Sequence, residues 1–157
     1  MYTHRKLFGH IAKAVGCKAL IVDYRRAPEH THPAQVDDAV TAYRWLLDEG
    51  YKPEHIATTG DSAGGALSTS VLLGIRAADL PLPVGAVPMS PWYDPQGTGE
   101  TLTTNADKDV LVKPEVLQGM ATTFLGTASP TDPQANLLKA DLKGLPPIYI
   151  QVGGDET

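Results

Sequence analysis

The residues with the clearest chemical potential are five in a row, Gly60-Asp61-Ser62-Ala63-Gly64. They match the pattern Gly-x-Ser-x-Gly, in which a serine lies on a sharp turn between a strand and a helix and presents its hydroxyl as a nucleophile. The context agrees, because a short strand is predicted over Ile56–Thr59 and a helix from about Ala63 to Leu80. A serine hydroxyl needs a histidine to take its proton, and the backbone N–H of Ala63 would help to hold an oxyanion.

The glycines of this motif support a strained turn. Gly64 and Gly65 fall in the first turn of the predicted helix, where each is less favourable than alanine by about 1 kcal/mol. A sharp turn at Ser62 that requires neighbours without side chains at Gly60 and Gly64 would explain them. Asp61 is interpreted as a spacer. The alternative is that Asp61 or Ser62 only caps the helix, a role that both residue types fill readily.

Strands and helices alternate along the rest of the chain. Besides 56–59, the predicted strands are 19–22, 84–87 and 148–152. The other predicted helices are one capped by Thr3 and ended by Gly16, one carrying Val36 to Leu47 and stopped by Gly50, and one over about 114–125. Strand-helix-strand units of about 30 residues predict an α/β fold, a three-layer αβα sandwich with a mostly parallel sheet. Residues 90–146 are too long for one crossover and are expected to form part of a cap.

Composition excludes several classes of function. The 157 residues fit one domain, and 13 basic against 18 acidic residues give a net charge of −5, which argues against nucleic acid or an anionic membrane as a partner. The longest apolar runs, 19–22 and 71–75, are far shorter than the roughly 20 residues of a membrane span. The single Cys17 forms no internal disulfide and is expected to be buried. No signal peptide is visible at the N-terminus, so a cytoplasmic chain is expected, with a leader lost by truncation left open.

Several segments together resemble one family, the alpha/beta hydrolase fold-3 or hormone-sensitive-lipase group of serine esterases, also called bacterial lipolytic family IV. Residues 60–65 resemble its nucleophile elbow, Asp23–His30 its Asp-Tyr-Arg-x-Ala-Pro-Glu-His stretch, Ser90–Asp94 its Ser-Pro segment, and Gly154–Glu156 the turn with its catalytic acid. The resemblance implies a carboxylesterase or lipase that cleaves short- to medium-chain esters through an acyl-enzyme on Ser62. It also implies no cofactor and a small-molecule ester as the partner.

The same resemblance assigns the catalytic acid to Asp155. Asp155 follows the predicted strand 148–152, and in open α/β sheets functional groups gather at the carboxyl ends of strands. Asp94, which follows the strand predicted at 84–87, is a competitor for the same reason. A third interpretation makes both aspartates ordinary turn residues.

The family's triad runs serine, acid, histidine along the chain, and the histidine is not found in this order. Five histidines are present, and all precede Ser62: His4, His10, His30, His32 and His55. The spacing of His30 and His32 occurs in some metal sites, but no third ligand pattern accompanies it. We therefore predict a solvated loop there and no metal.

Two family features are absent from the sequence: a His-Gly-Gly-Gly segment before the first helix and a histidine after Asp155. The family's strand before that glycine segment lies between 19–22 and 56–59, so we expect a gap in the sheet. Residues 1–157 are accordingly expected to be a partial α/β-hydrolase domain, truncated at both ends and inactive by itself. A non-catalytic small-molecule-binding protein and an inert fragment are the alternatives, and a homodimer of the complete protein is left open.

Overall fold

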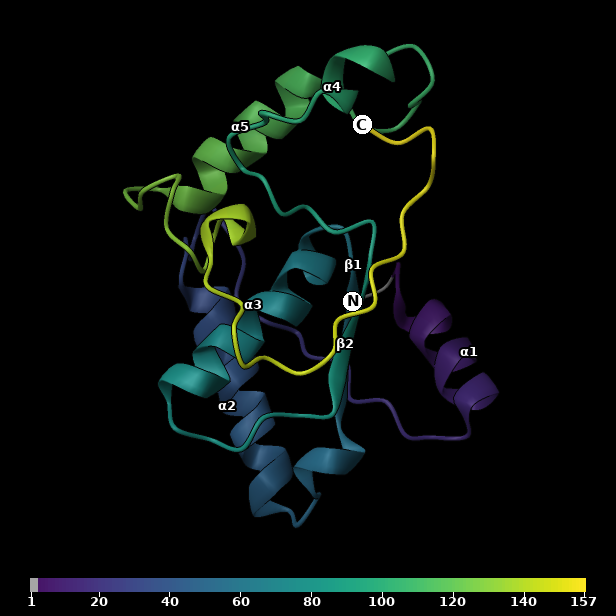
Figure 1. Cartoon of the computed structure of the whole chain (residues 1–157), viewed down its shortest axis with the longest axis vertical. Coiled ribbons are helices and arrows are strands. Elements are labelled where there is room, and N and C mark those ends of the chain that lie inside the picture. The colour runs from purple at the N-terminus through teal and green to yellow at the C-terminus, as the bar shows by residue number, and fades with distance from the viewer. Residues whose placement is uncertain (1–2) are drawn as a thin grey trace.

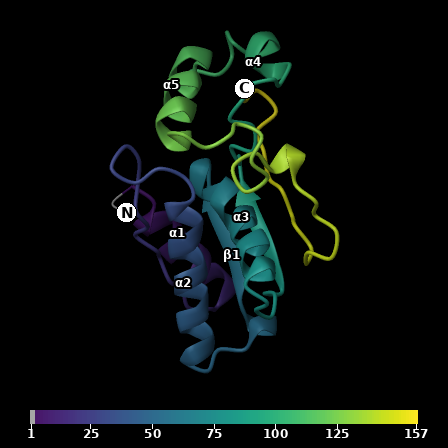
Figure 2. The same cartoon turned by 90° about the vertical axis from the view of Figure 1, so that its left-hand side faces the viewer.

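A computed structural model describes residues 3–157 and arranges them in three layers around a small parallel sheet (Figure 1). The elements in chain order are α1 (Arg5–Val15), α2 (Ala34–Asp48), η1 (Pro53–His55), β1 (Ala57–Asp61), α3 (Ala63–Ala77), β2 (Gly85–Met89), α4 (Thr101–Thr104), α5 (Pro114–Leu125) and η2 (Leu137–Lys139). Helix α1 lies on one side of the strands, and α2 and α3 lie on the other (Figures 1 and 2). The predicted α/β architecture is therefore confirmed.

Helix α3 is the centre of the fold. Residues Ser68–Ile75 are all buried, because the helix packs against both strands on one side and against α2 on the other. Tyr43 of α2 joins Val71 and Ile75 of α3 in the core, and its hydroxyl donates a hydrogen bond of 2.6 Å to the carbonyl of Pro81. Gly74 allows the two helices to approach closely, since a Cβ there would lie 2.7 Å from Cγ2 of Val40.

The strand predicted at residues 19–22 does not form. This segment is extended but has no ladder partner in the described part of the chain, and Ala19 and Leu20 are exposed. Its apolar run predicted burial on both faces, whereas a strand also requires a neighbour for its N–H and C=O groups. Among residues 3–157 the sheet consists of β1 and β2, and residues 19–22 pair with neither strand.

The strand predicted at residues 148–152 forms only in part. Its backbone runs parallel to β2, with isolated bridges from Ala86 to Ile148 and from Met89 to Gln151. Tyr149 N–H donates to Ala86 O and Gln151 N–H donates to Pro88 O. Between them the ladder is interrupted because Pro88 has no N–H to return to the facing strand.

The predicted helix boundaries hold well in the middle of the chain and less well at its start. Thr3 does not cap α1: the N-cap residue is His4, which makes no capping hydrogen bond. Gly16 does end this helix in the left-handed conformation, with φ of 74°. Cys17, expected to be buried, is exposed because it opens the unpaired segment before residue 23.

The long segment between β2 and residue 148 carries α4, α5 and η2, and its helices α4 and α5 stand beyond the carboxyl ends of the strands (Figures 1 and 2). This is the cap position expected from the sequence. No helix in residues 3–157 combines the length and the apolar character that a bilayer span requires.

The close approach at Gly74 gives a test of the α2–α3 packing. In the full-length protein, Gly74→Ala should lower the free energy of unfolding in urea by about 1–3 kcal/mol, because the added methyl group overlaps the stiff side chains of Val36 and Val40. Gly119→Ala in α5 is the matched control, since a Cβ there meets nothing within 4 Å and should stabilise by up to about 1 kcal/mol. Equal effects of both substitutions would contradict this packing.

Candidate active site

Ser62 occupies a strained turn between β1 and α3. Its φ of 55° and ψ of −116° lie in a region that residues with a side chain rarely adopt, at a cost of about 1–3 kcal/mol. Backbone hydrogen bonds hold it: Ser62 N–H donates to Met89 O (3.0 Å), and Ser62 O accepts from Ala66 N–H (3.0 Å) and Trp92 N–H (3.1 Å). The side chain is exposed and makes no capping hydrogen bond, so the interpretation of Ser62 as a helix cap is not supported.

The glycines around Ser62 differ in what they do. A Cβ on Gly60 would overlap the carbonyl group of Gly64, so β1 can pass α3 only where residue 60 lacks a side chain. A Cβ on Gly65 would lie 2.9 Å from Met89 O and 3.0 Å from Cα of Pro91. Gly64 was expected to be sterically required, but a Cβ there meets nothing within 4 Å in the described part of the chain. The steric demand therefore falls on Gly60 and Gly65.

Asp61 is more than a spacer, because its carboxylate Oδ2 lies 2.9 Å from Nε2 of His4. His4 is the N-cap residue of α1, and its Nδ1 lies 2.8 Å from the hydroxyl of Thr3. With Thr3 donating to Nδ1, Nε2 carries the proton and donates to Asp61. This contact joins α1 to the residue directly before Ser62. No local sequence pattern indicates this contact, since 57 positions separate the two residues.

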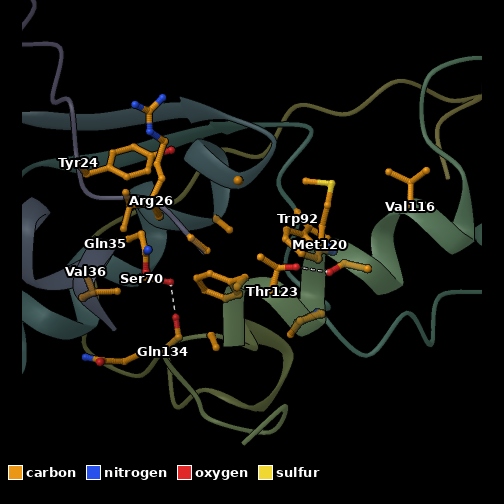
Figure 3. A pocket seen from close by; sticks show the side chains of 18 of the residues that line it. Tyr24, Arg26, Gln35, Val36, Ser70, Trp92, Val116, Met120, Thr123 and Gln134 are labelled. Atoms are coloured by element: carbon orange, nitrogen blue, oxygen red, sulfur yellow. Dashed lines mark hydrogen bonds between the residues drawn. The ribbon is translucent and has the colours of Figure 1, made fainter. Parts of the chain in front are cut away.

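A cavity of about 510 Å³ opens beside the elbow, between the body of the fold and the cap helix α5 (Figure 3). Ala63, the predicted oxyanion residue, lines it and is exposed. As the first residue of α3, Ala63 has an N–H that the helix leaves without an internal partner. The walls are mostly apolar and include Val36, Trp92 and Phe124. Size and lining match those of small-molecule sites, which are mainly apolar with a few polar groups.

Asp155 lies on the turn that follows the bridge between Met89 and Gln151, and Ser62 follows the pairing of Asp61 with the same Met89. Its side chain is 78% exposed, and Oδ1 lies 3.3 Å from Nζ of Lys108. The competing Asp94 is engaged by its own loop, because its carboxylate accepts hydrogen bonds from Gln96 N–H (2.9 Å), Thr98 N–H (2.6 Å) and the Thr98 hydroxyl (2.7 Å). The Asp94 carboxylate is thus engaged within its own loop, whereas the Asp155 carboxylate has an exposed ion pair with Lys108.

No histidine contact found in residues 3–157 involves Ser62 or Asp155. His32, predicted to be solvated, is in fact buried. Its ring packs edge-on against Phe124 of α5, and its backbone N–H donates a hydrogen bond of 2.8 Å to Phe124 O. Its Nε2 lies 3.6 Å from Asp132. The predicted solvated loop is therefore wrong for His32, because the short sequence around His30 and His32 does not indicate that α5 covers the ring.

The whole length of the chain, residues 1–157, matches the family model described as alpha/beta hydrolase fold. The chain belongs to this family. It is 42% identical over 155 residues to an acetyl-hydrolase of Streptomyces hygroscopicus, covering 99% of this chain and 52% of that protein. The crystal structure of an esterase from the bacterial hormone-sensitive lipase family superposes with a TM-score of 0.96 at 51% identity, covering 98% of this chain and 52% of that one.

A crystal structure of the esterase EstE5 soaked with p-nitrophenyl butyrate is similar to the same extent, with a TM-score of 0.95 and 47% identity over 98% of this chain and 52% of that chain. This alpha/beta hydrolase chain thus spans about half the length of the curated relatives and solved structures that it matches. The family resemblance drawn from the sequence motifs is confirmed.

The different roles of the glycines can be separated by alanine substitutions in the full-length protein. Gly60→Ala and Gly65→Ala should destabilise the protein and suppress labelling of Ser62 by a fluorophosphonate, because each added methyl group collides with backbone atoms. Gly64→Ala should leave stability unchanged or raise it by up to about 1 kcal/mol. Urea denaturation and the rate of labelling measure both effects. A Gly64→Ala protein as damaged as Gly60→Ala would contradict this assignment.

Proposed function

We propose that the full-length protein containing this chain is a serine hydrolase of short- to medium-chain carboxylic esters. The observation that carries the proposal is the strained backbone of Ser62, whose exposed hydroxyl is not used by the helix that it begins. The adjacent Ala63 opens onto an apolar cavity of about 510 Å³, which suits an acyl or alkyl group. The relatives named as an acetyl-hydrolase and as esterases support the same class of substrate.

In this mechanism the hydroxyl oxygen of Ser62 attacks the ester carbonyl while a histidine takes the hydroxyl proton. The N–H of Ala63 stabilises the oxyanion, and the histidine then gives its proton to the departing alcohol. Water next attacks the acyl-enzyme with the same histidine as base, which releases the acid and restores Ser62. We assign to Asp155 the role of orienting this histidine.

The histidine itself is proposed to come from a part of the protein outside residues 1–157. Neither His4 nor His32 forms a hydrogen bond with Ser62, because the His4 ring is hydrogen-bonded to Asp61 and the His32 ring is buried against Phe124. The chain described here would then be a partial domain that contributes the nucleophile, the acid and one side of the substrate cavity. A binding protein without catalysis would also use the cavity, but it would have no use for a serine whose backbone conformation costs free energy.

Substitution of the nucleophile tests the central assignment. Ser62→Ala should abolish both fluorophosphonate labelling and hydrolysis of p-nitrophenyl butyrate in the full-length protein, while Ser129→Ala, which removes an exposed serine of the cap, should change neither. Asp155→Asn should lower kcat by up to about 10⁴-fold, as expected when the partner of the base is lost. Activity should persist in EDTA. Labelling that survives in the Ser62→Ala protein would refute the proposal.

Residues 1–157 expressed alone should show no detectable turnover of p-nitrophenyl butyrate. Loss of a triad member leaves only the residual catalysis of the remaining site. The His-Gly-Gly-Gly segment that residues 1–157 lack supplies oxyanion N–H groups in the family, and loss of one such donor costs a further factor of about 10² to 10³. The measurement compares this chain with the full-length protein at equal concentration. Hydrolysis by the short chain that disappears in its Ser62→Ala variant would show that one of the histidines within residues 1–157 is the base.

A further inference from the structure

We propose that Asn105 and Asp109, two residues of the cap, are positioning residues that fix the turn Gly153–Thr157, which carries Asp155. This inference rests on the proposed function, in which Asp155 orients the catalytic histidine. Figure 1 shows the chain end beside α4 and the loop that follows it, and the view in Figure 2 agrees. Both residues lie in this loop, Asn105 at the end of α4 and Asp109 four residues later.

Asn105 contacts the backbone on both sides of Asp155. Its Nδ2 donates a hydrogen bond of 2.7 Å to Glu156 O and a longer one of 3.5 Å to Gly154 O. Asn105 is only 6% exposed, so water does not compete for this amide, and a buried donor without a partner is costly. The peptide groups that flank Asp155 are thereby fixed relative to the cap.

Asp109 joins the cap loop to the residue that follows the turn. Its Oδ1 accepts hydrogen bonds from Leu111 N–H and Val112 N–H, both 2.8 Å, and its Oδ2 accepts from the N–H (3.1 Å) and the hydroxyl (3.2 Å) of Thr157. The N–H groups of Val112, Leu111 and Thr157 lower the pKa of Asp109 to about 2. Asp109 is therefore a carboxylate, able to accept all four hydrogen bonds, throughout the pH range of an esterase assay.

Apart from Asn105 and Asp109, the turn is restrained by a hydrogen bond of 2.8 Å from the Ser90 hydroxyl to Glu156 Oε1 and by one of 3.4 Å from Glu156 N–H to Gly153 O. Gly153 and Gly154 precede Asp155, and glycine leaves the backbone free to adopt many conformations. Asp155 itself is 78% exposed, and its contact with the flexible side chain of Lys108 is a surface ion pair, which contributes little to order. The direction of the Asp155 carboxylate therefore depends on the backbone around it, which Asn105 contacts at Gly154 and Glu156 and Asp109 contacts at Thr157.

The experiment uses the full-length protein with p-nitrophenyl butyrate, and kcat is expressed per site titrated with a fluorophosphonate. Asp109→Asn keeps the shape of the side chain but turns an NH₂ group toward one pair of N–H donors, so the turn should shift. We expect kcat to fall by about 10- to 100-fold, the scale of a displacement of about 1 Å in a catalytic group, with KM within about twofold. The acidic limb of the pH profile should move to lower pH, because a histidine that loses its carboxylate partner has a lower pKa.

A second pair of variants tests the same contact from the other side. Thr157→Val removes the hydroxyl that donates to Asp109 and should lower kcat, whereas Thr157→Ser retains this hydroxyl and should restore most of the rate. Asp107→Asn is the matched control, since Asp107 is an exposed carboxylate of the same loop that makes none of these contacts. This pair keeps the test decisive even where Asp109→Asn fails to fold.

The outcomes separate this proposal from the proposed function. A large loss of kcat in Asp155→Asn together with wild-type kcat and pH profile in Asp109→Asn and Thr157→Val overturns the positioning role alone. Fewer titratable sites with unchanged kcat per site also overturn it, because that result indicates a purely structural role. Full activity in Asp155→Asn refutes both the acid assignment and the positioning role. A loss of kcat in Asp155→Asn, Asp109→Asn and Thr157→Val, together with the shifted acidic limb of the pH profile, supports both.

Discussion

The candidate site depends on the close packing of Gly60 against the carbonyl group of Gly64. This packing allows the chain to leave β1 and enter α3 within one residue, which gives Ser62 its positive φ. That conformation persists only where neighbours enforce it. They do so here because Met89 O accepts from Ser62 N–H, and Gly65 seats the first turn of α3 against Met89 and Pro91. The parallel pairing of β1 with β2 is therefore a condition for holding Ser62 in this conformation.

Several of the helices and the junction between β1 and α3 were predictable from the sequence, since short local patterns specify them. Helical periodicity with Pro114 at its start located α5, and the change from a strand-like run to glycines located the β1–α3 junction. For non-local reasons, the strand predicted at 19–22 does not form and the one predicted at 148–152 forms only in part. One has no neighbour in the described chain, and the other faces Pro88, which breaks its ladder.

The site was predictable only where its chemistry is contained in a short motif. Ser62 and its glycines form such a motif, although the steric role assigned to Gly64 belongs to Gly65, because only the fold shows which Cβ would meet Met89. The contact of His4 with Asp61 and that of Asn105 with Glu156 join residues 57 and 51 positions apart. Nothing in the local sequence around either residue indicates the partner, so these contacts required the three-dimensional structure.

The segment between β2 and residue 148 contributes to both halves of the candidate site. Trp92 and Phe124 line the cavity, while Asn105 and Asp109 contact the turn that carries Asp155. Phe124 is also the point at which the loop before α2 is attached, through the N–H and the buried ring of His32. One continuous stretch of backbone therefore makes the contacts of the cavity wall and those of the turn that carries Asp155.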